Sequence, residues 1–207
     1  MELTRDFPLF PLRLVALPSE LVPLHIFEDR YKAMIERCLE EPTEFGIVCL
    51  DEDGGEMLET GCACEIAEVL ERFDDGRVNL VARGTRAFRL TETQDDFEYP
   101  AGTVAFLDDL GDEADPELLA EVHEAYAELV REATDKEPDP AEIAGMSAYR
   151  IAGTVEFALE AKQQLLETRS EAVRAEQLLR LLRGALKRLE FMERAEARAR
   201  SNGKVRL

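Results

Sequence analysis

The sequence predicts an α+β fold in two lobes, a β-rich lobe over residues 1–109 and a helical lobe over residues 110–207. Short apolar runs separated by glycine- and proline-containing turns fill the first lobe, which is typical of a curled antiparallel sheet or pseudo-barrel with one helix. After Asp108 the apolar residues recur at helical spacing, which predicts a bundle that ends in a long helix. At 207 residues the chain is long enough to bury a sizeable core.

The first stretch of the β-rich lobe, residues 7–31, combines dense apolar residues with four prolines. Proline fixes φ and removes a backbone donor, so we expect short extended pieces that alternate with turns. Helical spacing then begins with Phe27 and Tyr31, and it predicts the first helix over residues 27–41. Pro42 is expected to end this helix.

The remaining strands of the β-rich lobe are predicted from apolar runs between turn signals. The pair Asp75-Gly76 between two such runs is a strong hairpin signal. Gly84 interrupts the run that follows, which indicates a bulge or bend in a curled sheet. The predicted strands are Phe45–Leu50, Gly61–Arg72, Arg77–Leu90 and Ala101–Leu107.

The helical lobe begins with a typical helix start. Asp115 and Pro116 supply an N-cap carboxylate and a first-turn proline, and Asp139 and Pro140 repeat the pattern. Together with the apolar spacing, these signals predict helices over residues 116–134, 140–146, 148–158, 160–168 and 171–200.

Charge is distributed unevenly along the chain, whose formal net charge is −20. Residues 1–160 hold 39 acidic and 13 basic residues, whereas residues 161–207 hold 6 acidic and 12 basic residues. Nucleic acids are bound by neutralising phosphates, so this acidic body disfavours RNA or DNA as a partner. The chain shows neither an apolar run long enough to span a membrane nor a secretory leader, and we therefore expect a cytoplasmic protein.

Residues that could carry catalysis or hold a cofactor or metal form no recognisable pattern. The chain lacks a phosphate loop, a nucleophile elbow and a zinc-protease motif. Cys62 and Cys64 are too close for a zinc knuckle, so these and the other cysteines are expected to be reduced and buried. Of the two histidines, His25 is predicted to lie in the core or at a strand end, and His123 is predicted to be solvated. We expect no catalytic residue, no cofactor and no metal.

Several motifs, in order and spacing, resemble the N-terminal domain of the Lon protease family. They lie in both lobes and extend over nearly the whole chain. The motifs are Phe7–Leu12, Val22–Tyr31, Phe45–Val48, Gly61–Ile66, Asp75–Arg77, Val81–Leu90, Ser147–Ala152 and Glu160–Glu167.

This resemblance implies a β lobe of the kind called PUA-like, joined to a helical bundle. It also implies recognition of substrate polypeptides, which is the role of this domain in the parent protease. The ATPase and protease modules of the parent have no counterpart in these residues, so we expect a standalone, non-catalytic binding module. An adaptor or holdase in protein quality control fits this description, with unfolded polypeptides and a separate protease or chaperone as partners.

The candidate polypeptide-binding residues are apolar residues of the proline-rich stretch and arginines of the sheet. The alternative is that the leucines belong to the core and the arginines pair with the surplus acids. The candidates are Leu14, Leu17, Leu21, Pro23, Arg83, Arg86 and Arg89.

A different class of function remains open. Two lobes generally form a concave seam, and such a seam is a common place for a small ligand or an active site. The alternative hypothesis is therefore a small-ligand-binding or enzymatic protein that acts at the junction of the two lobes. The oligomeric state and the identity of any client are not set by the sequence.

Overall fold

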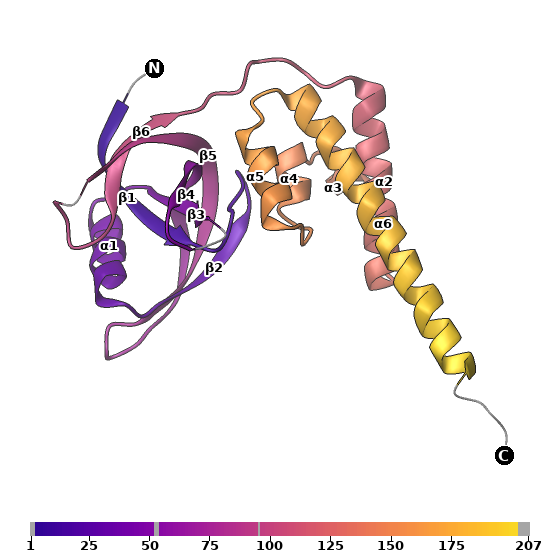
Figure 1. The fold of residues 1–207 in the computed structure, drawn as a ribbon, viewed down its shortest axis with the longest axis horizontal. Helices are drawn as coiled ribbons and strands as arrows, with labels where there is room; N and C mark the ends of the chain where they lie inside the picture. The colour runs from indigo at the N-terminus through magenta and orange to yellow at the C-terminus, as the bar shows by residue number, and fades with distance from the viewer. Residues whose placement is uncertain (1–2, 52–53, 95, 203–207) are drawn as a thin grey trace. The chain divides into compact units, whose positions relative to one another are not determined.

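The computed structural model describes residues 3–51, 54–94 and 96–202, with side chains up to residue 195, and it confirms the predicted α+β class. Figure 1 shows the strands and helices in chain order. The strands are β1 (Leu3–Leu12), β2 (Leu21–Ile26), β3 (Phe45–Leu50), β4 (Met57–Arg72), β5 (Val78–Gln94) and β6 (Ala101–Phe106). The helices are α1 (Asp29–Glu40), α2 (Pro116–Thr134), α3 (Pro140–Ala144), α4 (Ala148–Ala152), α5 (Leu159–Glu167) and α6 (Glu171–Asn202).

The strands form one curled sheet in the order β2-β5-β4-β3-β1-β6. Because β6 also pairs with β5, the strands from β5 round to β6 close into a barrel (Figure 1). Neighbouring strands are antiparallel except β1 and β3, which run in parallel with Leu9 beside Gly46. The expected antiparallel pattern did not include this pair, whose connection contains β2 and α1; parallel strands need such a crossover.

Strand β5 is long enough to pair with β2 along one part of its length and with β6 along another. Its residues 78–83 pair with β2, and its residues 88–94 pair with β6. In between, the pairing with β4 shifts, since Gly84 lies opposite Cys64 and Arg86 lies opposite Ala63. This shift confirms the bulge predicted at Gly84, and a bulge bends a strand as closure of a barrel requires.

Apolar side chains fill the barrel interior around the ring of Phe88. Phe7 packs edge-on against this ring, with ring centroids 5.5 Å apart. Gly46 and Gly61 also lie against it, and a Cβ atom at either position would approach the ring to 2.6 Å or less. The two glycines therefore make room for the Phe88 ring at the centre of the core.

The cysteines are buried, and none forms a disulfide within the described residues. Cys62 forms a side-chain hydrogen bond with the Cys64 thiol. This contact, and after it burial, raises the pKa of the Cys62 thiol. Among residues 3–51, 54–94 and 96–202, no three His, Cys, Asp or Glu side chains gather in the manner of a metal site.

Helix α1 lies beside the barrel (Figure 1). The ring of Tyr31 lies 4.4 Å from that of Phe10, measured between centroids, and joins the helix to β1. The helix begins at Asp29, two residues later than predicted, so Phe27 precedes it and is 59% exposed. The buried stripe of α1 consists of Tyr31, Met34, Ile35 and Cys38.

Packing divides the chain into two compact units. Unit 1 consists of residues 1–110 and 149–169, and unit 2 consists of residues 111–148 and 170–207. Helix α5 therefore packs with the barrel. A compact unit is defined by packing alone, whereas a domain also folds by itself, and the predicted boundary between residues 109 and 110 stays a prediction.

In unit 2, α2 and α6 lie side by side (Figure 1). The Asp115 carboxylate accepts a hydrogen bond from the Glu117 N–H at 2.8 Å, as predicted for the N-cap of α2. His123 was expected to be solvated, but it is half-buried and its Nε2 lies 3.2 Å from the Met146 carbonyl. Helices α3 and α4 are shorter than predicted, and a glycine follows each of them, Gly145 and Gly153.

Each helix in the described part of the chain is too short or too polar to cross a lipid bilayer.

Candidate functional site

A tight turn anchored on β5 sets the position of β2. The Glu20 N–H donates to the Leu17 carbonyl at 3.0 Å, Pro18 takes the second position, and Ser19 has a φ of 69°. These features define a type II turn. The Ser19 N–H then donates to the Gly84 carbonyl, and the Gly84 N–H donates to the Glu20 carbonyl. The turn and the bulge together fix where β2 begins.

Strands β2, β5 and β4 present three rows of side chains to solvent, which we call the β2 outer face. The first row, on β2, consists of Leu21, Pro23 and His25, and its partners across the register on β5 are Arg83, Val81 and Asn79. On β4 the same β5 residues pair with Glu65, Glu68 and Glu71. Directly opposed residues of antiparallel strands project to the same side of the sheet. The face therefore has an apolar row, a mixed row and an acidic row.

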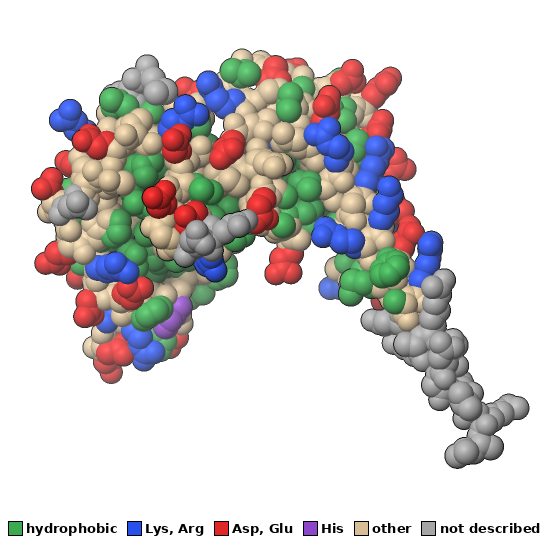
Figure 2. Space-filling view, viewed as in Figure 1, with side chains coloured by type: hydrophobic (Ala, Val, Ile, Leu, Met, Phe, Trp, Pro, Cys, Tyr) green, Lys and Arg blue, Asp and Glu red, His purple; other side chains and the backbone are tan. Residues whose placement is uncertain are grey.

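Apolar groups on the β2 outer face are unusually exposed. Leu21 is 58% exposed. Phe27 stacks on the His25 ring at a centroid distance of 5.9 Å, and Phe73 meets the same ring edge-on at 6.4 Å. Figure 2 shows that hydrophobic and acidic side chains share the surface of the barrel-containing unit. Exposed apolar groups that cluster in this way mark a surface for a partner more often than scattered single residues do.

Hydrogen bonds hold the polar groups of the face in place. Asn79 Oδ1 lies 2.6 Å from His25 Nδ1, and Asn79 Nδ2 donates to Glu71 Oε2 at 3.3 Å. Arg83 Nη1 lies 3.4 Å from Glu65 Oε1, with both side chains about half exposed. Because exposed ion pairs contribute little stability, these groups can exchange partners at low cost.

The seven predicted contact residues fall at several places in unit 1. Leu21, Pro23 and Arg83 come together on the β2 outer face. Leu17, the first residue of the turn, is fully buried. The half-buried Leu14 lines a hollow that also contains residues 153–157. As binding residues, all seven stay predictions.

The other two arginines lie elsewhere on the barrel. Arg86 pairs with Glu44 at 2.9 Å and lies 3.5 Å above the Phe106 ring. Arg89 is exposed opposite Thr60. Sequence reasoning missed Phe27, which it assigned to the helix, and it missed the acidic row. The spacing of the glutamates on β4 was visible, but their pairing with β5 was not.

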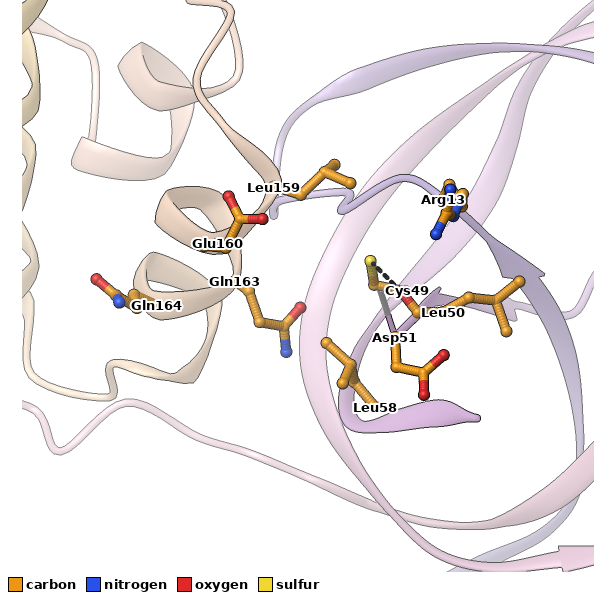
Figure 3. Close-up of a pocket in the computed structure, with 9 residues that line it drawn as sticks. All are labelled: Arg13, Cys49, Leu50, Asp51, Leu58, Leu159, Glu160, Gln163 and Gln164. Carbon is orange, nitrogen blue, oxygen red and sulfur yellow. Dashed lines mark hydrogen bonds between the residues drawn. The ribbon is translucent and has the colours of Figure 1, made fainter. Parts of the chain in front are cut away.

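A concave site lies between the β3–β4 hairpin and α5, and we call it the Gln163 groove. Its volume is about 580 Å³, and Cys49, Leu50 and Leu58 of the hairpin line one side (Figure 3). Helix α5 contributes Leu159 and Gln163. The charged side chains in the lining are Arg13, Asp51 and Glu160. Largely apolar walls with a few polar groups are the usual composition of a binding site.

The titratable groups of the groove have shifted pKa values with clear causes. The backbone N–H groups of Glu56 and Gly55 lower the pKa of the Asp51 carboxyl, which therefore stays ionised at neutral pH. Burial, and after it the negative charge of Glu160, raises the pKa of the Cys49 thiol. A thiol held protonated is a weak nucleophile, so this cysteine is suited to packing rather than to chemistry.

Two polar contacts fix α5 against the barrel. Lys162 Nζ donates to Glu20 Oε1 at 2.6 Å, and the two side chains are only 11% and 12% exposed. Gln163 Nε2 donates to the Thr60 carbonyl of β4 at 3.0 Å. Both contacts lie within unit 1, so the two walls of the groove form one packed structure.

Comparison with known proteins supplies independent information. A family model described as the ATP-dependent protease La (LON) substrate-binding domain matches residues 6–184. The Lon protease of Anaeromyxobacter dehalogenans (strain 2CP-C) is 27% identical over 192 residues. The match covers 84% of this chain but only 22% of that protein, so the chain spans about a fifth of the length of this relative.

Two solved structures share the fold. The crystal structure of a Lon N-terminal domain protein from Xanthomonas campestris has a TM-score of 0.63 and 27% sequence identity, and the match covers 86% of this chain and 98% of that one. The N-terminal domain of the Mycobacterium avium complex Lon protease has a TM-score of 0.61 and 23% identity, covering 85% and 97%. At its lower identity, the second structure supports the fold alone.

Proposed function

Since the chain belongs to the substrate-binding domain family of ATP-dependent protease La (LON), we propose that it binds polypeptides through the β2 outer face. The observation that carries the proposal is the three-row arrangement of side chains on β2, β5 and β4. An apolar row and an acidic row on one face, with the mixed row between them, match chain segments that contain both apolar and basic residues.

Burial of the apolar row, and of Phe27 just after it in the chain, supplies the affinity in this proposal. Leu21 and Phe27 each keep more than half of their surface exposed, so a bound segment can remove this area from water. The acidic row adds selection by charge, because it attracts basic segments and repels acidic ones. Such a surface accepts many sequences, as recognition of unfolded chains requires.

The proposal assigns binding and no catalysis to these residues. The family is that of a substrate-binding domain, and the family match covers most of the chain. We further propose that the protein acts as an adaptor or holdase in protein quality control. It would hold an unfolded client for a separate protease or chaperone. Affinity capture from a lysate of the source cells, followed by mass spectrometry, would identify such a partner.

Capture of an unfolded protein tests the proposed function. The probe is reduced and alkylated lysozyme, a basic chain without a fold, crosslinked to the protein at low salt. We expect capture well above that by an unrelated acidic globular protein. Replacement of the exposed leucine, Leu21→Ser, is expected to weaken binding about fivefold, since burial of this side chain contributes on the order of 1 kcal/mol.

Leu110→Ser is the matched control, because Leu110 is similarly exposed, at 65%, and does not belong to the β2 outer face. This variant is expected to bind the probe as the unchanged protein does. Equal losses in the two variants would place the binding surface elsewhere. Capture no greater than that by the acidic globular protein would refute the proposal.

A further inference from the structure

Gln163 combines deep burial with one hydrogen-bonding atom that has no partner. The side chain is 8% exposed, and it lies on α5 at the wall of the Gln163 groove. Its Nε2 donates to the Thr60 carbonyl at 3.0 Å and to Glu167 Oε1 at 2.8 Å. Its Oε1 is buried and accepts no hydrogen bond from the described residues.

The orientation of this amide is fixed by its neighbours. Thr60 and Glu167 both offer oxygen atoms, so the nitrogen of Gln163 must face them. The carbonyl oxygen then faces the space between α5 and the side chains of Cys49 and Leu58, as Figure 3 shows. A buried acceptor without a donor costs free energy. A ligand that donates an N–H to this acceptor recovers that free energy on binding.

A neighbouring hollow extends the Gln163 groove. A second hollow, of about 340 Å³, shares Arg13 and Leu159 with the first and continues along residues 153–157. An extended chain fits an elongated groove of this kind, and its backbone offers N–H groups at regular intervals. Leu50, Leu58 and Leu159 provide apolar contacts for a side chain of the bound segment.

Charge favours a segment with basic residues. The lining of the two hollows includes the carboxylates of Asp51, Glu156 and Glu160 and one guanidinium, that of Arg13, while Lys162 is paired with Glu20. The lining is therefore acidic overall, as the β2 outer face is.

We propose that Gln163 Oε1 accepts a main-chain N–H from an apolar residue of a polypeptide bound in the Gln163 groove. This subsite rests on the proposed function but lies apart from the β2 outer face. The face would select segments by composition. The groove would fix one residue of the segment and its direction, because a single acceptor sets where a backbone N–H must lie.

The test uses a small probe with the same groups, N-acetyl-leucine methylamide, and follows the backbone and side-chain amide signals of the ¹⁵N-labelled protein by NMR. We expect saturable shifts of the Gln163 side-chain amide and of the Leu50 and Leu58 backbone amides. The matched probe is the O-acetyl dimethylamide of leucic acid, which has the same apolar side chain and no N–H. It is expected to bind about fivefold more weakly, which is the typical effect of one lost hydrogen bond.

A pair of variants assigns the effect to the acceptor. Gln163→Lys keeps a donor for Thr60 and Glu167 but removes the acceptor, so both probes should bind it equally and weakly. Gln164→Lys adds the same charge at the next residue of α5, which is exposed and also lines the groove, and it leaves the Gln163 acceptor in place. It should keep the fivefold preference for the probe with N–H groups.

Three outcomes would overturn the subsite. Equal binding of the two probes to the unchanged protein would show that the groove accepts apolar bulk alone, and this measurement requires no variant to fold. Shifts of the groove signals with protein concentration, without any probe, would assign the groove to a second copy of the chain. Capture of unfolded lysozyme without any groove shift by the leucine probe would refute the subsite and leave the proposed function standing.

Discussion

The β2 outer face and the Gln163 groove belong to the same compact unit but offer a polypeptide different contacts. The face presents exposed apolar and acidic side chains in rows, so in the proposed function it selects segments by composition. The groove is concave and contains a buried amide carbonyl, so the direction of the chain also matters. One ion pair, between Lys162 of α5 and Glu20 of the turn before β2, connects the two. In the two proposals, breadth of recognition comes from exposed area, and orientation comes from a buried polar atom.

The largest expected effect is on the turn that places the β2 outer face. In Gly84→Ala the new Cβ would lie 2.1 Å from the Leu17 carbonyl oxygen and 3.1 Å from Cys62 Sγ. Neither neighbour can move away freely, because the first is backbone and the second is core. We expect the free energy of unfolding to fall by about 3 kcal/mol, measured by urea denaturation.

Gly55→Ala is the control for this change, because a Cβ at Gly55 would meet nothing within 4 Å. It should leave the unfolding free energy nearly unchanged. If the Gly84→Ala protein is as stable as the Gly55→Ala protein, the turn can move to accommodate the new Cβ. The placement of β2 would then not depend on the close approach of Gly84 to Leu17.

The second effect concerns the ion pair that connects the two surfaces. Lys162→Met leaves the Glu20 carboxylate with the Leu17 N–H as its remaining partner, at 2.9 Å. The pair is about nine-tenths buried, and after allowance for its residual solvation we expect a loss of about 2 kcal/mol in the free energy of unfolding. Because α5 also forms the groove wall, N-acetyl-leucine methylamide should bind this variant more weakly.

Two controls separate the ion pair from the loss of a lysine. Lys136→Met removes an exposed lysine of unit 2 and should cost almost nothing. In a background of Glu20→Gln, the cost of Lys162→Met should shrink, since the uncompensated charge is gone. If the cost is unchanged in that background, the lysine acts through packing and the ion pair does not couple the two surfaces.

Local signals in the sequence identified most elements of both surfaces. The Asp75-Gly76 hairpin forms as predicted, with Gly76 at a φ of 82°. The bulge at Gly84 and the N-cap at Asp115 also follow from single residues whose conformational preferences are strong. These features depend on neighbours in the chain, which a sequence displays directly.

Contacts between residues far apart in the chain could not be predicted from local sequence signals. The parallel pairing of β1 with β3 and the packing of α5 on the barrel depend on partners far apart, such as Gln163 and Thr60. Leu17 and Leu21 illustrate the same limit at short range, because a positive φ at Ser19 between them leaves one buried and the other exposed. The Gln163 groove could not be predicted, since both of its walls depend on such contacts.

The smallest effect separates the two surfaces by charge. Glu68 lies in the acidic row of the face opposite Val81, and it does not line the groove. Glu68→Gln should weaken binding of reduced and alkylated lysozyme about twofold at low salt and hardly at all at high salt, because exposed charges are screened. The neutral leucine probe should bind the groove of this variant as before. Glu36→Gln, an equal change of charge at an exposed residue of α1, is the control and should leave both affinities unchanged. A loss of equal size in that control would mean that net charge, and not the acidic row, attracts the basic chain. The face would then differ from the groove only in its exposed apolar area.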